Sequence, residues 1–296
     1  MKRYMFFLLL LLTAGSSMAQ QPMEKPWAWG PFVRPDGVNP IISPDTNSVF
    51  FCPMTKDVIR WEYSDTFNPA ATVINNRVVV LYRAEDKLAQ GIGRRTSRIG
   101  YASSDDGIHF DRHPSPVMFP ADDAQAANEH PGGCEDPRVC QTEDGLYVMM
   151  YTSWNRQVAR LSVATSRDLV HWTKHGPAFG MAYGGKYRDI FCKSGSIVTK
   201  VVDGRQVIAR INGKYWMYWG ENFVNVATSP DLIHWTPMQT PKGELLKVML
   251  PRKGRFDSLL TECGPPAIVT KDGILLFYNG KNSSGEDGDQ RFAANS

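Results

Sequence analysis

The sequence lacks the cysteine patterns that mark metal sites and disulfide frameworks. Five cysteines occur in 296 residues, and no two of them have the Cys-x-x-Cys spacing. An odd number without that spacing argues against a zinc site and against a complete set of disulfides. We expect no metal, no cofactor and buried free thiols, with one disulfide as the alternative. The cysteines are Cys52, Cys134, Cys140, Cys192 and Cys263.

A strong excess of positive or negative charge is also absent, and this argues against a nucleic-acid partner. The chain carries 33 Lys and Arg against 30 Asp and Glu, and no long basic run follows Arg3. Nucleic-acid binding usually requires a clustered basic surface, so we expect no nucleic-acid partner. Hydrophobic residues make up 42% of the chain, which is enough for a sizeable folded core.

The apolar run near the N-terminus is too short to span a membrane. It extends from Met5 to Leu12, whereas a spanning helix needs about 20 residues. Lys2 and Arg3 precede it, and Ala19 ends a small-residue stretch suited to cleavage. We expect a signal peptide over residues 1–19, followed by an N-terminal extension over 20–38. The protein would then be exported, to the periplasm if its source is Gram-negative.

Long helical apolar periods are missing, and a repeat takes their place. Segments 102–110, 164–172 and 227–235 share the pattern Ala-x-Ser-x-Asp-x-x-His-aromatic, and their alanines lie 62 or 63 residues apart. A period of this kind predicts stacked or radially repeated units. Without helices between the units, a parallel sheet with crossover connections is disfavoured.

Each repeat also contains a hairpin signal. Runs of β-branched and aromatic residues flank Asn75-Asn76, Asp144-Gly145, Asn212-Gly213 and Asp272-Gly273. Such turns favour tight antiparallel hairpins, so each unit is predicted to be a four-stranded blade. Blades repeated around an axis form a β-propeller, here over residues 39–296. The next corner is due near residue 290, so we expect the last unit to be unfinished and the sequence truncated.

The Asp and His of the repeated corner have two interpretations. Both residue types serve in acid–base catalysis. A motif that recurs once per blade is better explained as a structural fastener, in which the Asp accepts turn N–H groups and the aromatic fills a gap between blades. We therefore look for function where the repeats differ.

Polar residues beside Gly or Pro interrupt the repeat and provide candidate acids. Paired carboxylates in a concave site suit glycosidic cleavage, in which one protonates the leaving oxygen while the other activates water or attacks the sugar. The candidates are Asp136, Glu221 and Glu262. Alternatively, Asp136 caps a turn and the glutamates pair with arginines. Arg83, Arg98 and Arg138 could likewise bind sugar hydroxyls or pair with these acids.

These motifs together resemble glycoside hydrolase family 130, whose members are five-bladed β-propellers acting on β-mannosides. The resemblance runs from about Asn39 to the C-terminus. It rests on Phe67-Asn68-Pro69-Ala70, Tyr82-Arg83-Ala84, Ser97-Arg98-Ile99-Gly100, Gly133-Cys134-Glu135-Asp136-Pro137-Arg138 and the corners. It implies that Asp136 is the proton donor, a role that the family's phosphorylases perform through a sugar hydroxyl. The implied substrate-binding residues are Asn47, Ser48, Asn68, Arg83, Arg98, Arg138 and Asn279.

Two departures from the phosphorylase pattern favour hydrolysis. Asn279 stands where phosphorylases usually have a phosphate-holding His, and Glu262 stands where they tend to have Gly. A carboxylate repels a phosphate dianion and can act as a base for water. The resemblance therefore implies an exported β-mannosidase that removes β-linked mannose, at β-1,2 linkages, from mannose-containing oligosaccharides with inversion. Asp136 would be the acid, and Glu221 or Glu262 the base.

Two alternatives remain open on the sequence. The first is a β-mannoside phosphorylase that releases mannose 1-phosphate, with Arg156 or Lys193 contacting phosphate. The second is a sugar-binding propeller without catalysis. Product analysis with and without phosphate separates them.

Overall fold

The computed structural model describes residues 36–86 and 91–282. The chain divides between Asn39 and Pro40 into two units, and the second contains every strand described below. The predicted signal peptide over 1–19, most of the predicted extension and the corner due near residue 290 lie outside the described residues. Within the described ranges, no helix has the length and apolar character needed to cross a bilayer.

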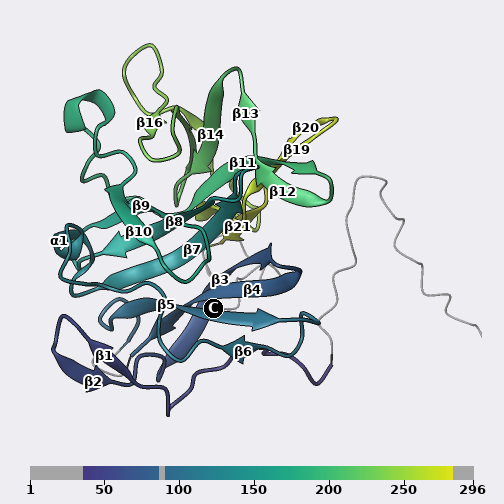
Figure 1. Cartoon of the computed structure of the whole chain (residues 1–296). Helices are drawn as coiled ribbons and strands as arrows, with labels where there is room; N and C mark the ends of the chain where they lie inside the picture. The colour runs from purple at the N-terminus through teal and green to yellow at the C-terminus, as the bar shows by residue number, and fades with distance from the viewer. Residues whose placement is uncertain (1–35, 87–90, 283–296) are drawn as a thin grey trace, which may run out of the picture. The chain divides into compact units, whose positions relative to one another are not determined.

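The first two repeats form four-stranded antiparallel sheets (Figure 1). Asn75 and Asn76, with φ of 50° and 61°, make the tight turn between the first two strands of the first sheet. That sheet contains β3 (Asp65–Ile74), β4 (Arg77–Glu85), β5 (Ser97–Ser104) and β6 (Asp111–Arg112). The second contains β7 (Gly133–Gln141), β8 (Tyr147–Trp154), β9 (Ala159–Ser166) and β10 (Thr173–Pro177).

The third sheet has the same core order with short additions. Its main strands are β11 (Gly195–Val202), β14 (Lys214–Trp219), β15 (Val224–Ser229) and β16 (Thr236–Pro237). β12 (Arg205–Ile208) extends β11, β13 (Arg210–Ile211) pairs with β14, and β17 (Lys247–Met249) pairs with β15. Two further pairs follow, namely β18 (Leu260–Cys263) with β21 (Tyr278–Lys281) and β19 (Ala267–Thr270) with β20 (Gly273–Leu275).

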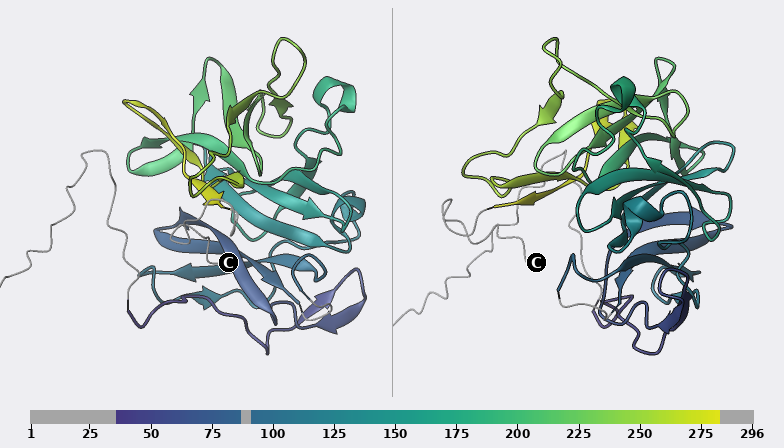
Figure 2. Two further views of the ribbon diagram at one scale, coloured as in Figure 1. Left: turned by 180° about the vertical axis from the view of Figure 1, so that it is seen from behind. Right: turned by 90° about the vertical axis from the view of Figure 1, so that its left-hand side faces the viewer.

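The sheets follow one another in the order of the chain, from purple through teal to green in Figure 2. Both β3 and β11 contact β7. Short parallel bridges join β5 to β7, β12 to β7 and β11 to β19. The remaining elements are a hairpin of β1 (Phe50–Cys52) and β2 (Asp57–Ile59), and the single turns α1 (Ala126–Glu129) and η1 (Ala182–Gly185). The all-β prediction is confirmed. The described strands form three four-stranded sheets and part of a fourth, so the count of five blades stays a prediction.

Apolar side chains fill the spaces between neighbouring sheets. One buried cluster joins Leu81 of β4 to Met149 of β8, and a second joins Val163 of β9 to Trp219 of β14. All five cysteines are buried and free, as expected from the odd count. Burial of this apolar surface is the main favourable contribution to the stability of such sheets.

The repeated corners are structural fasteners, as predicted. Asp231 accepts the N–H groups of Ile233 and His234 at 2.9 and 2.8 Å, and its second oxygen lies 2.7 Å from the His234 ring nitrogen. Asp106 and Asp168 make the same contacts. Trp235 completes the corner by packing into the cluster between the second and third sheets.

Replacing Asp231 with Ala should therefore lower stability without affecting the chemistry. Burial alone would raise the pKa of Asp231, but the bonds to His234 and the turn outweigh it and lower the pKa to about 2. We expect a loss of about 1 kcal/mol in unfolding free energy at neutral pH, because the side chain is partly exposed to solvent. The loss should shrink as pH falls from about 4 towards 2, since protonation then removes the same contacts from the native protein. Urea unfolding across this range measures it, and an unchanged stability at pH 7 would contradict it.

Candidate active site

Two matching bulges in the first strands of the first two sheets build the centre of the site. β3 is interrupted at Asn68-Pro69 and β7 at Asp136-Pro137. Asn68 and Asp136 have φ of 46° and 50°, a region that Asn and Asp enter more readily than most residues. Proline suits such positions because it has no N–H for the ladder. The Asn68 amide then donates to Asp136 Oδ1 at 2.8 Å.

Asp136 is buried among cations. Its exposed fraction is 6%, Arg83 Nη1 donates to Oδ1 at 3.1 Å, and the Lys193 ammonium lies 3.9 Å from Oδ2. Burial, the largest single effect, would raise the pKa of Asp136, but Arg83, Lys193 and the Asn68 hydrogen bond outweigh it and lower the pKa. Oδ2 is the oxygen that Asn68 and Arg83 leave free.

Arg83 is held by carboxylates. Its Nη2 lies 2.6 Å from Glu85 and 3.0 Å from Glu135, while its Nε donates to Ser97 at 3.0 Å. The guanidinium also lies over the Phe67 ring, 4.6 Å from the centroid. These contacts support the ion-pair interpretation of Arg83 and place it in direct contact with the predicted acid.

Two further carboxylates approach from the third sheet and from β18. Glu221 is the second residue after β14, and the N–H of the intervening Gly220 donates to the carbonyls of Lys193 and Ser194. Burial raises the pKa of Glu221, Lys193 opposes this, and Glu262 and Asp136 raise it further. Glu221 Oε2 is buried and receives no hydrogen bond from the described residues. Glu262 accepts a short hydrogen bond from the Ser194 hydroxyl, and its Oε1 lies 3.6 Å from Arg138 Nη2.

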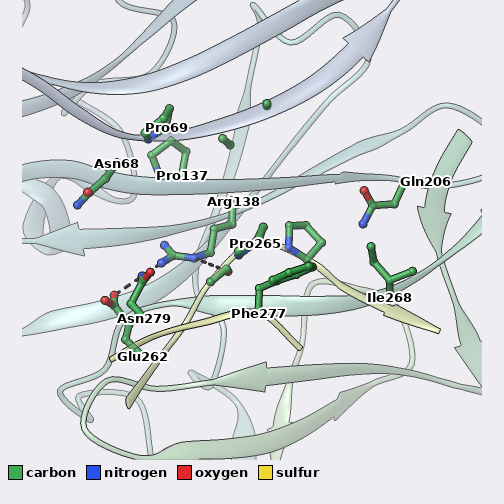
Figure 3. A pocket seen from close by; sticks show the side chains of 14 residues that line it. Asn68, Pro69, Pro137, Arg138, Gln206, Glu262, Pro265, Ile268, Phe277 and Asn279 are labelled. Atoms are coloured by element: carbon green, nitrogen blue, oxygen red, sulfur yellow. Dashed lines mark hydrogen bonds and ion pairs between the residues drawn. The ribbon is translucent and has the colours of Figure 1, made fainter. Parts of the chain in front are cut away.

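A cavity of about 500 Å³ lies beside these groups (Figure 3). Asn68, Arg138, Glu262 and Asn279 contribute its polar lining, and Phe277 is among the apolar side chains. Glu262 and Asn279 are paired across β18 and β21, which explains why the two residues that depart from the phosphorylase pattern lie together. Volumes of this order accommodate small ligands.

Arg138 connects the two sides of this cavity. Its Nε and Nη2 donate to the carbonyls of Gly264 and Cys263, both at 2.9 Å, and its Nη1 donates to the Asp136 carbonyl at 3.1 Å. One guanidinium thus ties β7 to the end of β18. Arg138 lines the cavity, as expected for a binding residue, but three of its donors hold backbone.

The other predicted binding residues have different surroundings. Arg98 is 1% exposed, with Nη1 donating to Asp86 at 2.8 Å and Nη2 lying 3.6 Å from the Cys52 sulfur. Asn47 and Ser48 lie in a turn closed by Asp45, which accepts hydrogen bonds from both. The residues that line the cavity include none of these three, and they do not include Arg83, Asp136 or Glu221 either. The roles of Asn47, Ser48 and Arg98 in binding stay predictions.

Four residues of this site escaped the candidate list drawn from the sequence. Glu85, Ser97 and Glu135 hold Arg83, and Ser194 holds Glu262. Local signals were present for the two acids, since Glu135 is adjacent to Asp136 and Glu85 lies two residues beyond Arg83, on the same side of its strand.

Carboxyl groups grouped beside a hydrogen-bonding cavity are the arrangement that most enzymes hydrolysing glycosidic bonds use. Comparison with known proteins gives the family. The model of glycoside hydrolase family 130, described as β-1,4-mannooligosaccharide phosphorylase, matches residues 46–292. The chain belongs to this family, whose members are enzymes acting on mannosides.

Individual relatives fall into two groups. The chain is 30% identical to the 1,2-β-oligomannan phosphorylase of Thermoanaerobacter sp. (strain X514), over 76% of this chain and 68% of that protein. A glycosyl hydrolase structure from Bacteroides ovatus is 63% identical, with a TM-score of 0.88 over 91% of this chain and 75% of that one. Another solved structure is described with the finding that this family of mannoside phosphorylases contains glycoside hydrolases. Those hydrolases target β-1,2 mannosidic linkages in Candida mannan. The structure is 61% identical, with a TM-score of 0.87 over 88% of this chain and 72% of that one.

Proposed function

We propose that this protein is a β-mannosidase that transfers mannose from β-linked, and specifically β-1,2-linked, mannosides to water. The observation that carries the proposal is a group of carboxylates around the predicted acid. Glu221 is near enough to Asp136 and Glu262 for their charges to raise its pKa, and Arg138 links Glu262 to the Asp136 carbonyl. A phosphate dianion entering this site would meet two carboxylates, whereas water needs one of them as its base.

In this mechanism Asp136 protonates the departing sugar, either directly or through a sugar hydroxyl. Oδ2 is the oxygen that would carry the proton, because Asn68 and Arg83 both bind Oδ1. The lowered pKa of Asp136 means that the free site holds it ionised. Asn68 and Arg138, which both contact Asp136, line the cavity. A substrate bound there would remove the remaining solvent near Asp136, and desolvation raises the pKa of a carboxyl group.

Glu221 is the better placed base. Its pKa is raised, first by burial, and its Oε2 has no hydrogen-bond donor among the described residues, so that oxygen is available to a water molecule. Glu262 is held by Ser194 and lies near Arg138, an arrangement suited to fixing the wall of the cavity. Water activated by Glu221 would attack the anomeric carbon as the glycosidic bond breaks, which inverts its configuration.

The relatives support the same direction. The structure described with hydrolases of β-1,2 mannosidic linkages is 61% identical in sequence to this chain. The 1,2-β-oligomannan phosphorylase is 30% identical. The phosphorylase alternative keeps one observation in its favour, since Lys193 brings a cation into the site.

Incubation with β-1,2-mannobiose, with and without phosphate, tests the proposal. We expect free mannose at the same rate in both conditions, because the base acts on water. Chromatography of the products measures this. Mannose 1-phosphate formed only with phosphate would establish the phosphorylase instead, and binding without turnover would establish a sugar-binding protein.

A further inference from the structure

The acid Asp136 and three neighbouring side chains form a closed ring of alternating charge. Arg83 lies 3.0 Å from Glu135 and 3.1 Å from Asp136, through its two terminal nitrogens. Lys193 lies 3.1 Å from Glu135 and 3.9 Å from Asp136, through one ammonium. Each cation therefore contacts both acids. Three members of the ring are buried, since the side chains of Glu135, Asp136 and Arg83 are 3%, 7% and 4% exposed, whereas that of Lys193 is 23% exposed.

The ring is asymmetric at Lys193. Its ammonium is 0.8 Å closer to Glu135 than to Asp136, a difference between 3.1 and 3.9 Å. Charge attraction falls with distance, and in a buried site it is only weakly screened. The closest contact of Lys193 is therefore with Glu135, and Asp136 Oδ2 has only the longer ion pair at 3.9 Å.

We propose that Glu135 is a positioning residue that draws Lys193 away from Asp136 and so keeps the acid able to take up its proton. The inference rests on the proposed role of Asp136 as proton donor. Without the Glu135 charge, Lys193 would move onto Asp136 Oδ2 and hold that oxygen as a carboxylate. The charge of Glu135 also acts directly, because a neighbouring anion disfavours ionisation of Asp136.

The pKa values of the two acids in the ring are shifted in opposite directions. Burial raises the pKa of Glu135, although Arg83 and Lys193 oppose it, whereas the pKa of Asp136 is lowered. The charged groups that surround Asp136 come from several elements. They are Arg83 on β4, Glu135 and Arg138 on β7, Lys193 before β11, Glu221 after β14 and, through Arg138, Glu262 on β18.

The test compares the pH profiles of two variants that should move in opposite directions. The alkaline limb of kcat reports the acid that must stay protonated in the substrate complex, where desolvation raises the pKa of Asp136. E135Q keeps the shape of the side chain and removes its charge, so the limb should move to lower pH by about one unit. K193M removes the cation, so the limb should move to higher pH by about one unit. The double variant should lie between them.

Controls separate this role from a structural one. Glu143→Gln removes an exposed carboxylate that pairs with Lys200 at 2.7 Å, and its limb should match the wild type. E135D restores the charge and should recover part of the E135Q shift, with KM nearly unchanged in all variants. A merely structural Glu135 would lower thermal stability and leave the limb in place.

Each outcome decides the inference. The inference is overturned if the alkaline limb of E135Q stays at its wild-type pH or moves to higher pH. It is also overturned if the limbs of E135Q and K193M move in the same direction. If E135Q does not fold, K193M is the deciding variant. An alkaline limb of K193M that does not move to higher pH also overturns the inference. The measurement works with water or phosphate as the acceptor, so a phosphorylase would refute the proposed function without refuting this inference.

Discussion

Replacement of Asp136 by Asn should lower kcat by about 10² to 10⁴, the usual contribution of a positioned acid. The amide keeps the size of the side chain and can still accept a hydrogen bond from Arg83, but it cannot supply the proton. Binding of β-1,2-mannobiose should survive, because Arg138 and Asn279 still line the cavity. Release of mannose by the purified variant, with calorimetry for binding, measures the two effects separately.

Asp168→Asn is the matched control for this experiment. Asp168 belongs to a corner, where it accepts turn N–H groups at 2.9 and 2.8 Å and pairs with His171. Its replacement should reduce stability and leave kcat unchanged. Wild-type turnover in Asp136→Asn would show that the proton comes from another group.

Replacement of Glu221 by Gln should have a comparably large effect, also about 10² to 10⁴ in kcat, because water then has no base. Azide should restore turnover, since it is already an anion and needs no deprotonation. The carbon–nitrogen bond would form as the glycosidic bond breaks, with Asp136 protonating the leaving group. Detection of mannosyl azide by mass spectrometry measures this rescue.

Glu262→Gln is the matched comparison, because it removes the carboxylate that lines the cavity. Glu262 is bonded to Ser194 and lies near Arg138, so its loss should disturb the cavity wall. We expect a smaller fall in kcat and no gain from azide. Rescue of Glu262→Gln instead of Glu221→Gln would exchange the roles assigned to the two residues.

The sheets could be predicted because their signals are local. Asn212 and Gly213 have φ of 51° and 75°, and the turn they form is encoded by those two residues alone. The corners are equally local, since Asp168 bonds to residues two and three positions ahead. Asp136 could be identified because its motif breaks the repeat.

The surroundings of the acid could not be derived in this way. Glu135 meets Lys193 across 58 residues of sequence, and Arg83 meets Asp136 across 53. Spacing says nothing about which side chains meet when separate sheets come together. Arg98 shows the same limit, because its partner Asp86 follows the neighbouring strand and no motif marks the pair.

The matching bulges on β3 and β7 allow the chemical group at the site to change while the backbone stays the same. Both place one residue at φ of 46° to 50° before a proline, and the two backbones are alike although one side chain is an amide and the other an acid. An exchange between Asn and Asp at such a position requires no new backbone conformation. A repeat of this type can therefore gain or lose an acid by a single substitution, so duplicated units could acquire separate duties while remaining interchangeable as building blocks.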